Sequence, residues 1–138
     1  MNTRRFSILF GILACTILVL SVKAEEEVKK TAENGAVIFY RTRSAKGGAI
    51  RLRITAGDNA DVGHLTNGSK IVKELPVGEF TFVVTSPSIG GRDSVTINVE
   101  AGKTYYVKGQ ALMGWPAARP KFTLMDEKKG KAESDKIK

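Results

Sequence analysis

The chain is poor in the side chains from which most catalytic and metal centres are built. Its 138 residues include one cysteine, Cys15, and one histidine, His64. A single cysteine cannot close an intramolecular disulfide, which excludes a small disulfide-stabilised scaffold. One histidine and one cysteine are also too few for the usual zinc clusters. The length allows one domain, and the composition is that of a globular protein.

The sequence motifs of common enzymes are also absent. No Gly-x-Ser-x-Gly sequence supplies a hydrolase nucleophile, and no Walker or dinucleotide-binding glycine pattern occurs. His64 lies in a predicted strand or turn, and we expect its replacement by alanine to leave function largely intact. Segment 58–61 has two carboxylates but lacks the ligand ladder of a calcium loop, so we expect a turn there. The sequence therefore predicts a non-enzymatic protein with no catalytic residues, no metal and no cofactor.

The longest apolar run lies near the N-terminus and predicts export. Two arginines precede the apolar stretch 6–22, and Ala24 ends a Val-Lys-Ala sequence typical of a signal-peptide cleavage site. We expect residues 1–24 to form a signal-peptide helix that is removed after Ala24, leaving a periplasmic or extracellular protein. The alternatives are an uncleaved membrane anchor, lipidation at Cys15, and twin-arginine export. Cleavage would also remove the only thiol, which suits an oxidising compartment.

Composition divides the rest of the chain into three parts. Residues 25–34 are polar and are expected to form a linker. Residues 35–125 contain twelve of the fourteen glycines and are expected to form the folded domain. Residues 126–138 are highly charged, and we expect a disordered tail, because such a segment buries too little apolar surface to offset the entropy of ordering.

The glycine-rich middle of the chain has the alternation of short β-strands. Apolar residues alternate with Arg51 and Arg53 in the segment 50–54, and a similar alternation runs through 94–99. Seven or eight such segments are separated by turn residues, including Asn67-Gly68, a strong hairpin signal. They are 36–43, 50–54, 61–65, 70–75, 79–85, 94–99, 103–108 and 121–125. This pattern predicts an all-β fold after the signal-peptide helix: a small two-sheet antiparallel sandwich, either immunoglobulin-like or prealbumin-like.

Four arginines are candidates for ligand binding. Arg41 and Arg43 share one face of the first predicted strand, and Arg51 and Arg53 share one face of the next. A hairpin of these strands would gather four guanidinium groups, which suit bidentate binding of carboxylate or phosphate. Export and the lack of interleaved aromatic residues argue against nucleic acid and favour an envelope polyanion: phospholipid head groups, lipopolysaccharide phosphates or peptidoglycan carboxylates. The alternative is a solvated basic face with no ligand.

Aromatic residues near the C-terminus are expected to be mainly structural. Tyr105 and Tyr106 point to opposite faces of one strand, so at least one should be buried. Trp115, the only tryptophan, lies between the last two predicted strands. We expect it to fill a core position beneath the loop; if exposed, it would be the natural contact residue for a partner.

Four turn-and-strand motifs in the middle of the chain are similar to those of a known family. They are IFYR at 38–41, VGHLTNG at 62–68, LPVGEF at 75–80 and EAGKTYYV at 100–107. With them, the stretch from Ala36 to about Glu127 resembles the exported bacterial domain-of-unknown-function family 2846, and the Pro-x-Gly and Ala-Gly-Lys-x-Tyr-Tyr steps resemble PEGA-class surface modules. The resemblance implies an all-β sandwich in the cell envelope with no established activity, and it carries over no catalytic residue.

Together these patterns predict a non-enzymatic exported β-sandwich module of the bacterial cell envelope that binds a protein or an anionic envelope polymer. The expected ligand-binding residues are Arg41, Arg43, Arg51, Arg53 and Trp115. We expect no nucleic-acid partner, and membrane contact only through the signal segment. The alternative is a structural or assembly subunit of an envelope complex with no ligand of its own.

Overall fold

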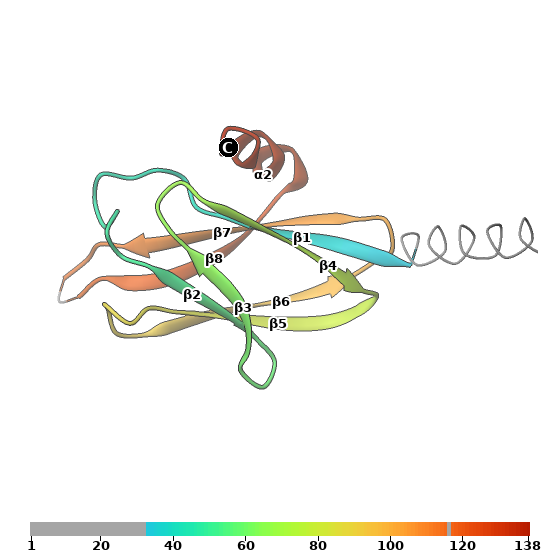
Figure 1. Ribbon diagram of the computed structural model, residues 1–138, viewed down its shortest axis with the longest axis horizontal. Coiled ribbons are helices and arrows are strands. Elements are labelled where there is room, and N and C mark those ends of the chain that lie inside the picture. Colours follow the sequence, from blue (N-terminus) through green and yellow to red (C-terminus); the bar gives the residue numbers. More distant parts are fainter. Residues whose placement is uncertain (1–32, 116) are drawn as a thin grey trace, which may run out of the picture. The chain divides into compact units, whose positions relative to one another are not determined.

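The chain folds as a sandwich of two four-stranded sheets (Figure 1). The computed structural model describes residues 33–115 and 117–138. Its strands are β1 (Asn34–Tyr40), β2 (Leu52–Ala56), β3 (Ala60–Leu65), β4 (Lys70–Pro76), β5 (Gly78–Thr85), β6 (Arg92–Val99), β7 (Thr104–Leu112) and β8 (Arg119–Met125). The first sheet has the order β4-β1-β7-β8 and the second β3-β2-β5-β6. Neighbouring strands are antiparallel except β1 and β7, which are parallel.

The predicted all-β sandwich is confirmed, and each predicted segment overlaps one strand. β1 and β2 lie in different sheets, whereas the first two strands of the immunoglobulin constant arrangement share a sheet. Of the two expected arrangements, the topology therefore excludes the immunoglobulin order and leaves the prealbumin-like one. The predicted signal-peptide helix and nearly all of the predicted linker lie outside the described residues.

Alternate side chains of the strands form the core between the sheets. In β2 the buried Leu52 and Ile54 flank the exposed Arg53, as the alternation predicts. Phe39 of the first sheet packs edge-on against Phe82 of the second, with ring centroids 4.9 Å apart. Such burial of apolar surface is the main stabilising contribution in a domain of this size. The buried residues of this core are Val37, Phe39, Leu52, Ile54, Leu65, Phe82, Val84, Ile97, Val99, Val107 and Phe122.

A short helix, α2 (Glu127–Ser134), covers part of the outer face of the first sheet, where a disordered tail was expected (Figure 1). Asp126 caps it, accepting a hydrogen bond from the backbone N–H of Lys129 at 3.1 Å. Ile137, which is 7% exposed, packs with Tyr40 and Tyr106 in a second apolar cluster. The composition argument was wrong here because two tyrosines on the outer face of the sheet provide the apolar surface that the charged segment lacks.

The directions of the strands determine at which end of the sandwich each connection lies. β1, β3, β5 and β7 run toward one end, and β2, β4, β6 and β8 begin there (Figure 1). We call this end the loop end; its connections are 41–51, 66–69, 86–91 and 113–118. The connections 41–51 and 66–69 each cross from one sheet to the other. The β1–β2 hairpin that would have gathered the four arginines therefore does not form, and the hairpin predicted at Asn67-Gly68 is wrong.

Candidate functional site

Arg41 lies inside the loop end rather than on a binding surface. The side chain is only 3% exposed, and its guanidinium donates hydrogen bonds to the backbone carbonyls of Ile50 and, at 2.6 Å, of Gly47. Burial lowers the pKa of the guanidinium, although an arginine remains charged throughout the usual pH range. The predicted ligand-binding role of Arg41 is therefore not supported by its position; it organises the connection 41–51.

The Asn67-Gly68 turn also holds the connection 41–51 in place, through hydrogen bonds to its backbone. The Asn67 side chain accepts a hydrogen bond from Ser44 N at 2.8 Å and donates one to Ser44 O at 3.1 Å. Gly68 has a φ of 73° and lies against the Arg43 side chain, where an added methyl group would collide with it. The two connections thus form one hydrogen-bonded unit at the loop end.

The other three arginines are exposed but do not form the single predicted cluster. Arg53, on the outer face of β2, lies opposite His64 of β3, and its Nε is 3.5 Å from Asp61. Arg51 precedes β2, and Arg43 lies in the connection after β1. The face shared by four guanidiniums does not exist, because β1 and β2 belong to different sheets.

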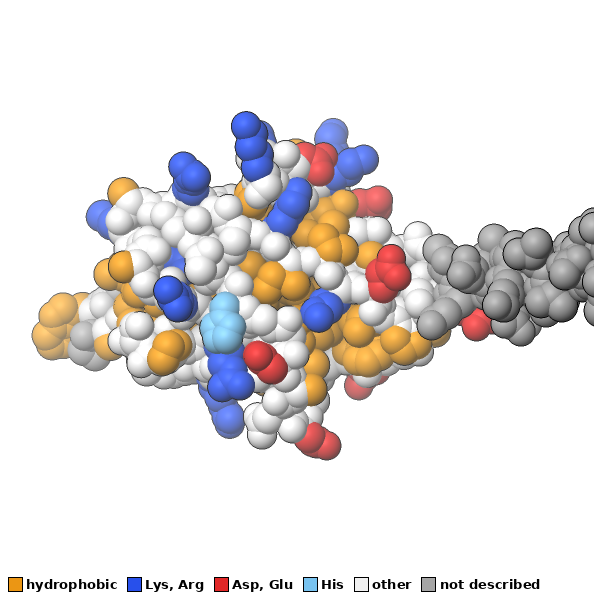
Figure 2. All heavy atoms as spheres, in the orientation of Figure 1, with side chains coloured by type: hydrophobic (Ala, Val, Ile, Leu, Met, Phe, Trp, Pro, Cys, Tyr) orange, Lys and Arg blue, Asp and Glu red, His pale blue; other side chains and the backbone are white. Residues whose placement is uncertain are grey.

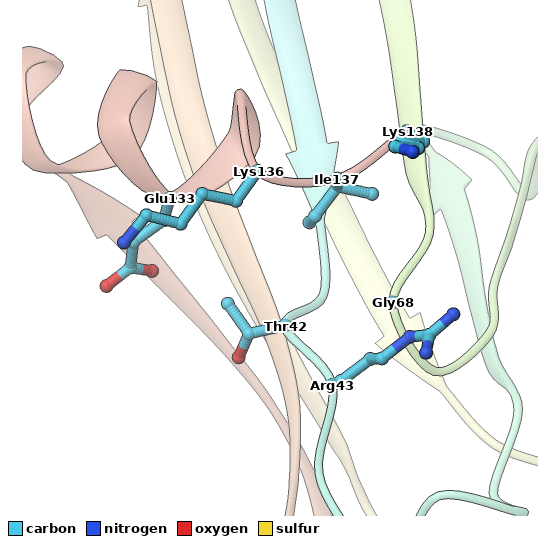
Figure 3. Close-up of a pocket in the computed structure, with 7 residues that line it drawn as sticks. All are labelled: Thr42, Arg43, Gly68, Glu133, Lys136, Ile137 and Lys138. Carbon is cyan, nitrogen blue, oxygen red and sulfur yellow. The ribbon is translucent and has the colours of Figure 1, made fainter.

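Arg43 lines a pocket between the loop end and the segment that follows α2 (Figure 3). The pocket has a volume of about 640 Å³, and Figure 3 shows Arg43 and Lys138 on one side of it, with Glu133 and Lys136 on the other. Within the described residues neither Arg43 nor Lys138 forms an ion pair. The lining residues are Thr42, Arg43, Gly68, Glu133, Lys136, Ile137 and Lys138.

The one carboxylate side chain in the pocket wall is already occupied. Glu133 forms an ion pair with Lys108 at 2.8 Å and accepts a hydrogen bond from the hydroxyl of Tyr40 at 2.9 Å. The hydrogen bond from Lys108 is the main reason why the pKa of Glu133 is lowered. Burial and the bond to Glu133 raise the pKa of Tyr40, which keeps its hydroxyl protonated as a donor. This network holds α2 on the sheet and leaves the pocket cationic.

Exposed positive charge gathers around the whole loop end. The four loop-end connections contain four Lys or Arg residues and no Asp or Glu. A basic residue also begins, or directly precedes, each of the strands that start there. Together they provide six exposed cations, the loop-end cations: Arg43, Lys46, Arg51, Lys70, Arg92 and Arg119. Figure 2 shows basic but no acidic side chains over this end on the visible face.

Apart from Glu133 and Asp135, whose segment lies beside the loop end, the acidic residues of the described chain lie at or toward the opposite end, or are bonded to the backbone. The carboxylate nearest in sequence to the four connections, Asp93, accepts hydrogen bonds from Phe122 N at 3.0 Å and Ser94 N at 2.9 Å. The opposite end carries a group of exposed carboxylates: Asp58, Glu79, Glu100, Asp126 and Glu127. The sandwich is therefore electrically polarised along its strands.

Trp115 is at the tip of the β7–β8 hairpin and is 96% exposed, so the expectation that it fills a core position is wrong. Leu112 and Met113, on the same hairpin, are 44% and 55% exposed. We call these three residues the apolar tip. β7 continues to Leu112, beyond the predicted end at 108, and this longer hairpin carries the tryptophan past the core.

The loop-end charge pattern was missed although the sequence contains it. Consecutive antiparallel strands place every second connection at the same end, and these connections could have been checked together for charge. Among residues 33–115 and 117–138 no group of three or more potential metal ligands occurs. No helix in these ranges is long and apolar enough to span a membrane.

Comparisons with family models, curated proteins and solved structures gave no match. The resemblance to family 2846 therefore stays a prediction from the sequence motifs.

Proposed function

We propose that the protein is a non-enzymatic exported module of the bacterial cell envelope that binds an anionic partner with its loop end. The observation that carries the proposal is the separation of charge along the strands, with six exposed cations at the loop end and carboxylates at the other. The signal-like N-terminus and the motifs that resemble an exported family support the location. The sandwich provides the rigid frame from which the loops project.

A one-sided distribution of charge favours binding of polyanions because their attraction to the cations is not cancelled by nearby carboxylates. Four of the loop-end cations are arginines, whose planar guanidinium groups bind phosphate and carboxylate oxygens in pairs. The pocket beside Arg43 adds a concave position where one such group would lie between Arg43 and Lys138. The proposed site is thus the loop-end surface together with this pocket.

The alternative function, a structural subunit that binds another envelope protein, is favoured by one observation. An exposed tryptophan beside two other large apolar residues is the kind of anchor that fills a pocket in a protein partner. A protein-binding tip would act without strong dependence on salt, which distinguishes this function from binding to an anionic partner.

The proposal is tested by binding to immobilised polyphosphate and to purified peptidoglycan at increasing salt concentration. We expect binding that weakens with salt and is strongly reduced in the double variant Arg43→Gln, Arg51→Gln. The matched control is Lys128→Gln, Lys129→Gln on α2, which removes the same charge away from the loop end and should retain binding. Binding to neither these polymers nor anionic vesicles, or equal loss in the two double variants, would contradict the proposal.

A further inference from the structure

We infer that the anionic partner is a lipid bilayer and that the apolar tip inserts into its interfacial region while the loop-end cations contact lipid phosphates. This inference rests on the proposed function and names its partner. It differs from the expectation that only the signal segment contacts a membrane, because it assigns that contact to the folded sandwich.

The apolar tip has the composition that a membrane interface favours. Trp115, Met113 and Leu112 expose large apolar side chains at the extreme of the hairpin, where the rest of the described chain does not cover them. Tryptophan is enriched at the boundary between head groups and acyl chains, because its ring is apolar and its indole N–H finds a hydrogen-bond acceptor there. Figure 2 shows hydrophobic side chains that protrude at one end of the molecule, the end at which the β7–β8 hairpin of Figure 1 turns.

The tip is held in place at its base, so it is a fixed projection rather than a loose loop. Gly47, whose carbonyl accepts a hydrogen bond from Arg41, lies so close that a methyl group on it would be 3.3 Å from Sδ of Met113. On the other strand of the hairpin Pro120 is buried. The buried Arg41 therefore fixes the connection against which the tip rests.

Cations lie directly beside the tip. Arg119 is the cross-strand partner of Leu112, and Lys46 and Leu112 line the same small pocket. An apolar insertion and a basic surround together give stable attachment to anionic membranes, where either one alone is marginal. A soluble anionic polymer would bind the cations but offers no apolar layer to Trp115, so the combined surface fits a bilayer better.

Within the described part of the chain, neither the start of the sandwich nor helix α2 covers the tip. Asn34, the first residue of β1, lies at the end opposite the loop end, because β1 runs toward the loop end. The described sandwich therefore begins at the end opposite the tip. Helix α2 lies on the outer face of the first sheet and does not cover the hairpin tip (Figure 1).

Trp115 provides the direct test because it is the only tryptophan. The chain from Glu25 onward contains the whole compact unit Asn34–Lys138 with both apolar clusters, and this form is mixed with phosphatidylcholine vesicles with or without phosphatidylglycerol. We expect the tryptophan emission to shift to the blue, and to be quenched by brominated acyl chains, only when phosphatidylglycerol is present. Unchanged tryptophan emission with the vesicles that contain phosphatidylglycerol overturns the inference.

Matched variants separate the contribution of the tip from that of charge. Met113→Asp should weaken vesicle binding about tenfold, because the substitution removes the exposed half of an apolar side chain from the interface and places a carboxylate there. Val77→Asp is the control, since Val77 is 57% exposed in the turn at the opposite end. This variant should bind vesicles as the unchanged protein does. Lys46→Gln with Arg51→Gln should weaken binding about 30-fold, and Lys128→Gln with Lys129→Gln much less.

The outcomes distinguish this inference from the proposed function. Binding to polyphosphate and peptidoglycan with no change of Trp115 emission on vesicles overturns the inference and leaves the proposed function standing. Binding to none of the three materials overturns both. Equal vesicle binding by Met113→Asp and the unchanged protein overturns insertion of the tip. If an envelope protein shifts the Trp115 emission to the blue without vesicles, and vesicles alone do not, the partner of the tip is a protein and the inference of a bilayer is overturned.

Discussion

Gly130 of α2 lies directly against Tyr106 of β7, and a methyl group added at Gly130 would overlap the Cβ and Cγ atoms of the tyrosine. The absence of a side chain at position 130 is what allows the helix to approach the sheet. Around this contact, Ile137 packs with Tyr40 and Tyr106, and Glu133 is bonded to Tyr40 and Lys108. These contacts attach α2 to the sandwich and form one wall of the cationic pocket.

Replacement of Gly130 by alanine should therefore detach α2. Alanine favours an isolated helix over glycine by up to about 1 kcal/mol, whereas the clash with Tyr106 should cost about 1–3 kcal/mol. We expect a net loss of stability, measured by thermal unfolding, and faster proteolysis within 127–138. The control Ala132→Gly, at an exposed position of α2, should lose only the stability that comes from the higher helix propensity of alanine. A Gly130→Ala protein more stable than the unchanged one would contradict this packing.

Attachment of α2 should weaken in acid through Glu133. Its folded pKa is lowered, chiefly by the hydrogen bond from Lys108, so its contribution is complete above the ordinary carboxyl range and is lost as pH falls through the folded pKa. Glu133→Gln should cost at most about 1 kcal/mol at neutral pH, since the side chain stays partly exposed. The two proteins should converge in stability over the acid range in which Glu133 becomes protonated in the folded state. A constant difference across that range in thermal unfolding would contradict the assignment.

Replacement of Arg41 should lower the stability of the fold, because its side chain is buried and bonded to the backbone. Arg41→Met leaves the carbonyls of Gly47 and Ile50 without their charged donor and should cost about 3 kcal/mol in denaturant unfolding. Arg41→Lys should rescue little, because one ammonium cannot reproduce the planar pair of donors. Amide hydrogen exchange in 44–50 should accelerate in both variants. Unaltered stability with lost binding would instead make Arg41 a ligand-binding residue.

His64 should be dispensable. It is exposed on β3, opposite Arg53, and is not one of the loop-end cations. His64→Ala should change the free energy of unfolding by less than about 0.5 kcal/mol and leave vesicle and polymer binding intact. Loss of binding in a folded His64→Ala protein would show that the outer face of β2 and β3 contributes to the site.

Local patterns predicted the strands well because alternation is a property of neighbouring residues. The exposed Arg53 between buried Leu52 and Ile54, and the inward Ile97 and Val99 of β6, follow directly from the period of two. Which strands pair depends on contacts between distant segments. The connection 41–51 looked like a hairpin loop, yet the buried Arg41 makes it a crossing between the sheets.

The errors at Trp115 and in the tail have the same origin. A tryptophan is usually buried, but the β7–β8 hairpin extends past the core and no described segment lies over its tip. The tail has too few apolar residues to fold alone, and composition could not show that Tyr40 and Tyr106 would receive Ile137. Asp126, a good helix N-cap before a run of lysines, was the one local signal of α2.

The most direct test of the account is the orientation of the sandwich on an anionic bilayer. The chain from Glu25 onward contains no cysteine, so a single spin label can be placed at Ala117→Cys beside the tip or at Ala101→Cys at the opposite end. The depth of each label is measured from its relative accessibility to oxygen and to a water-soluble nickel chelate. We predict the label at 117 within the interfacial region and the label at 101 in water. Both labels in water on bound protein would contradict insertion of the tip.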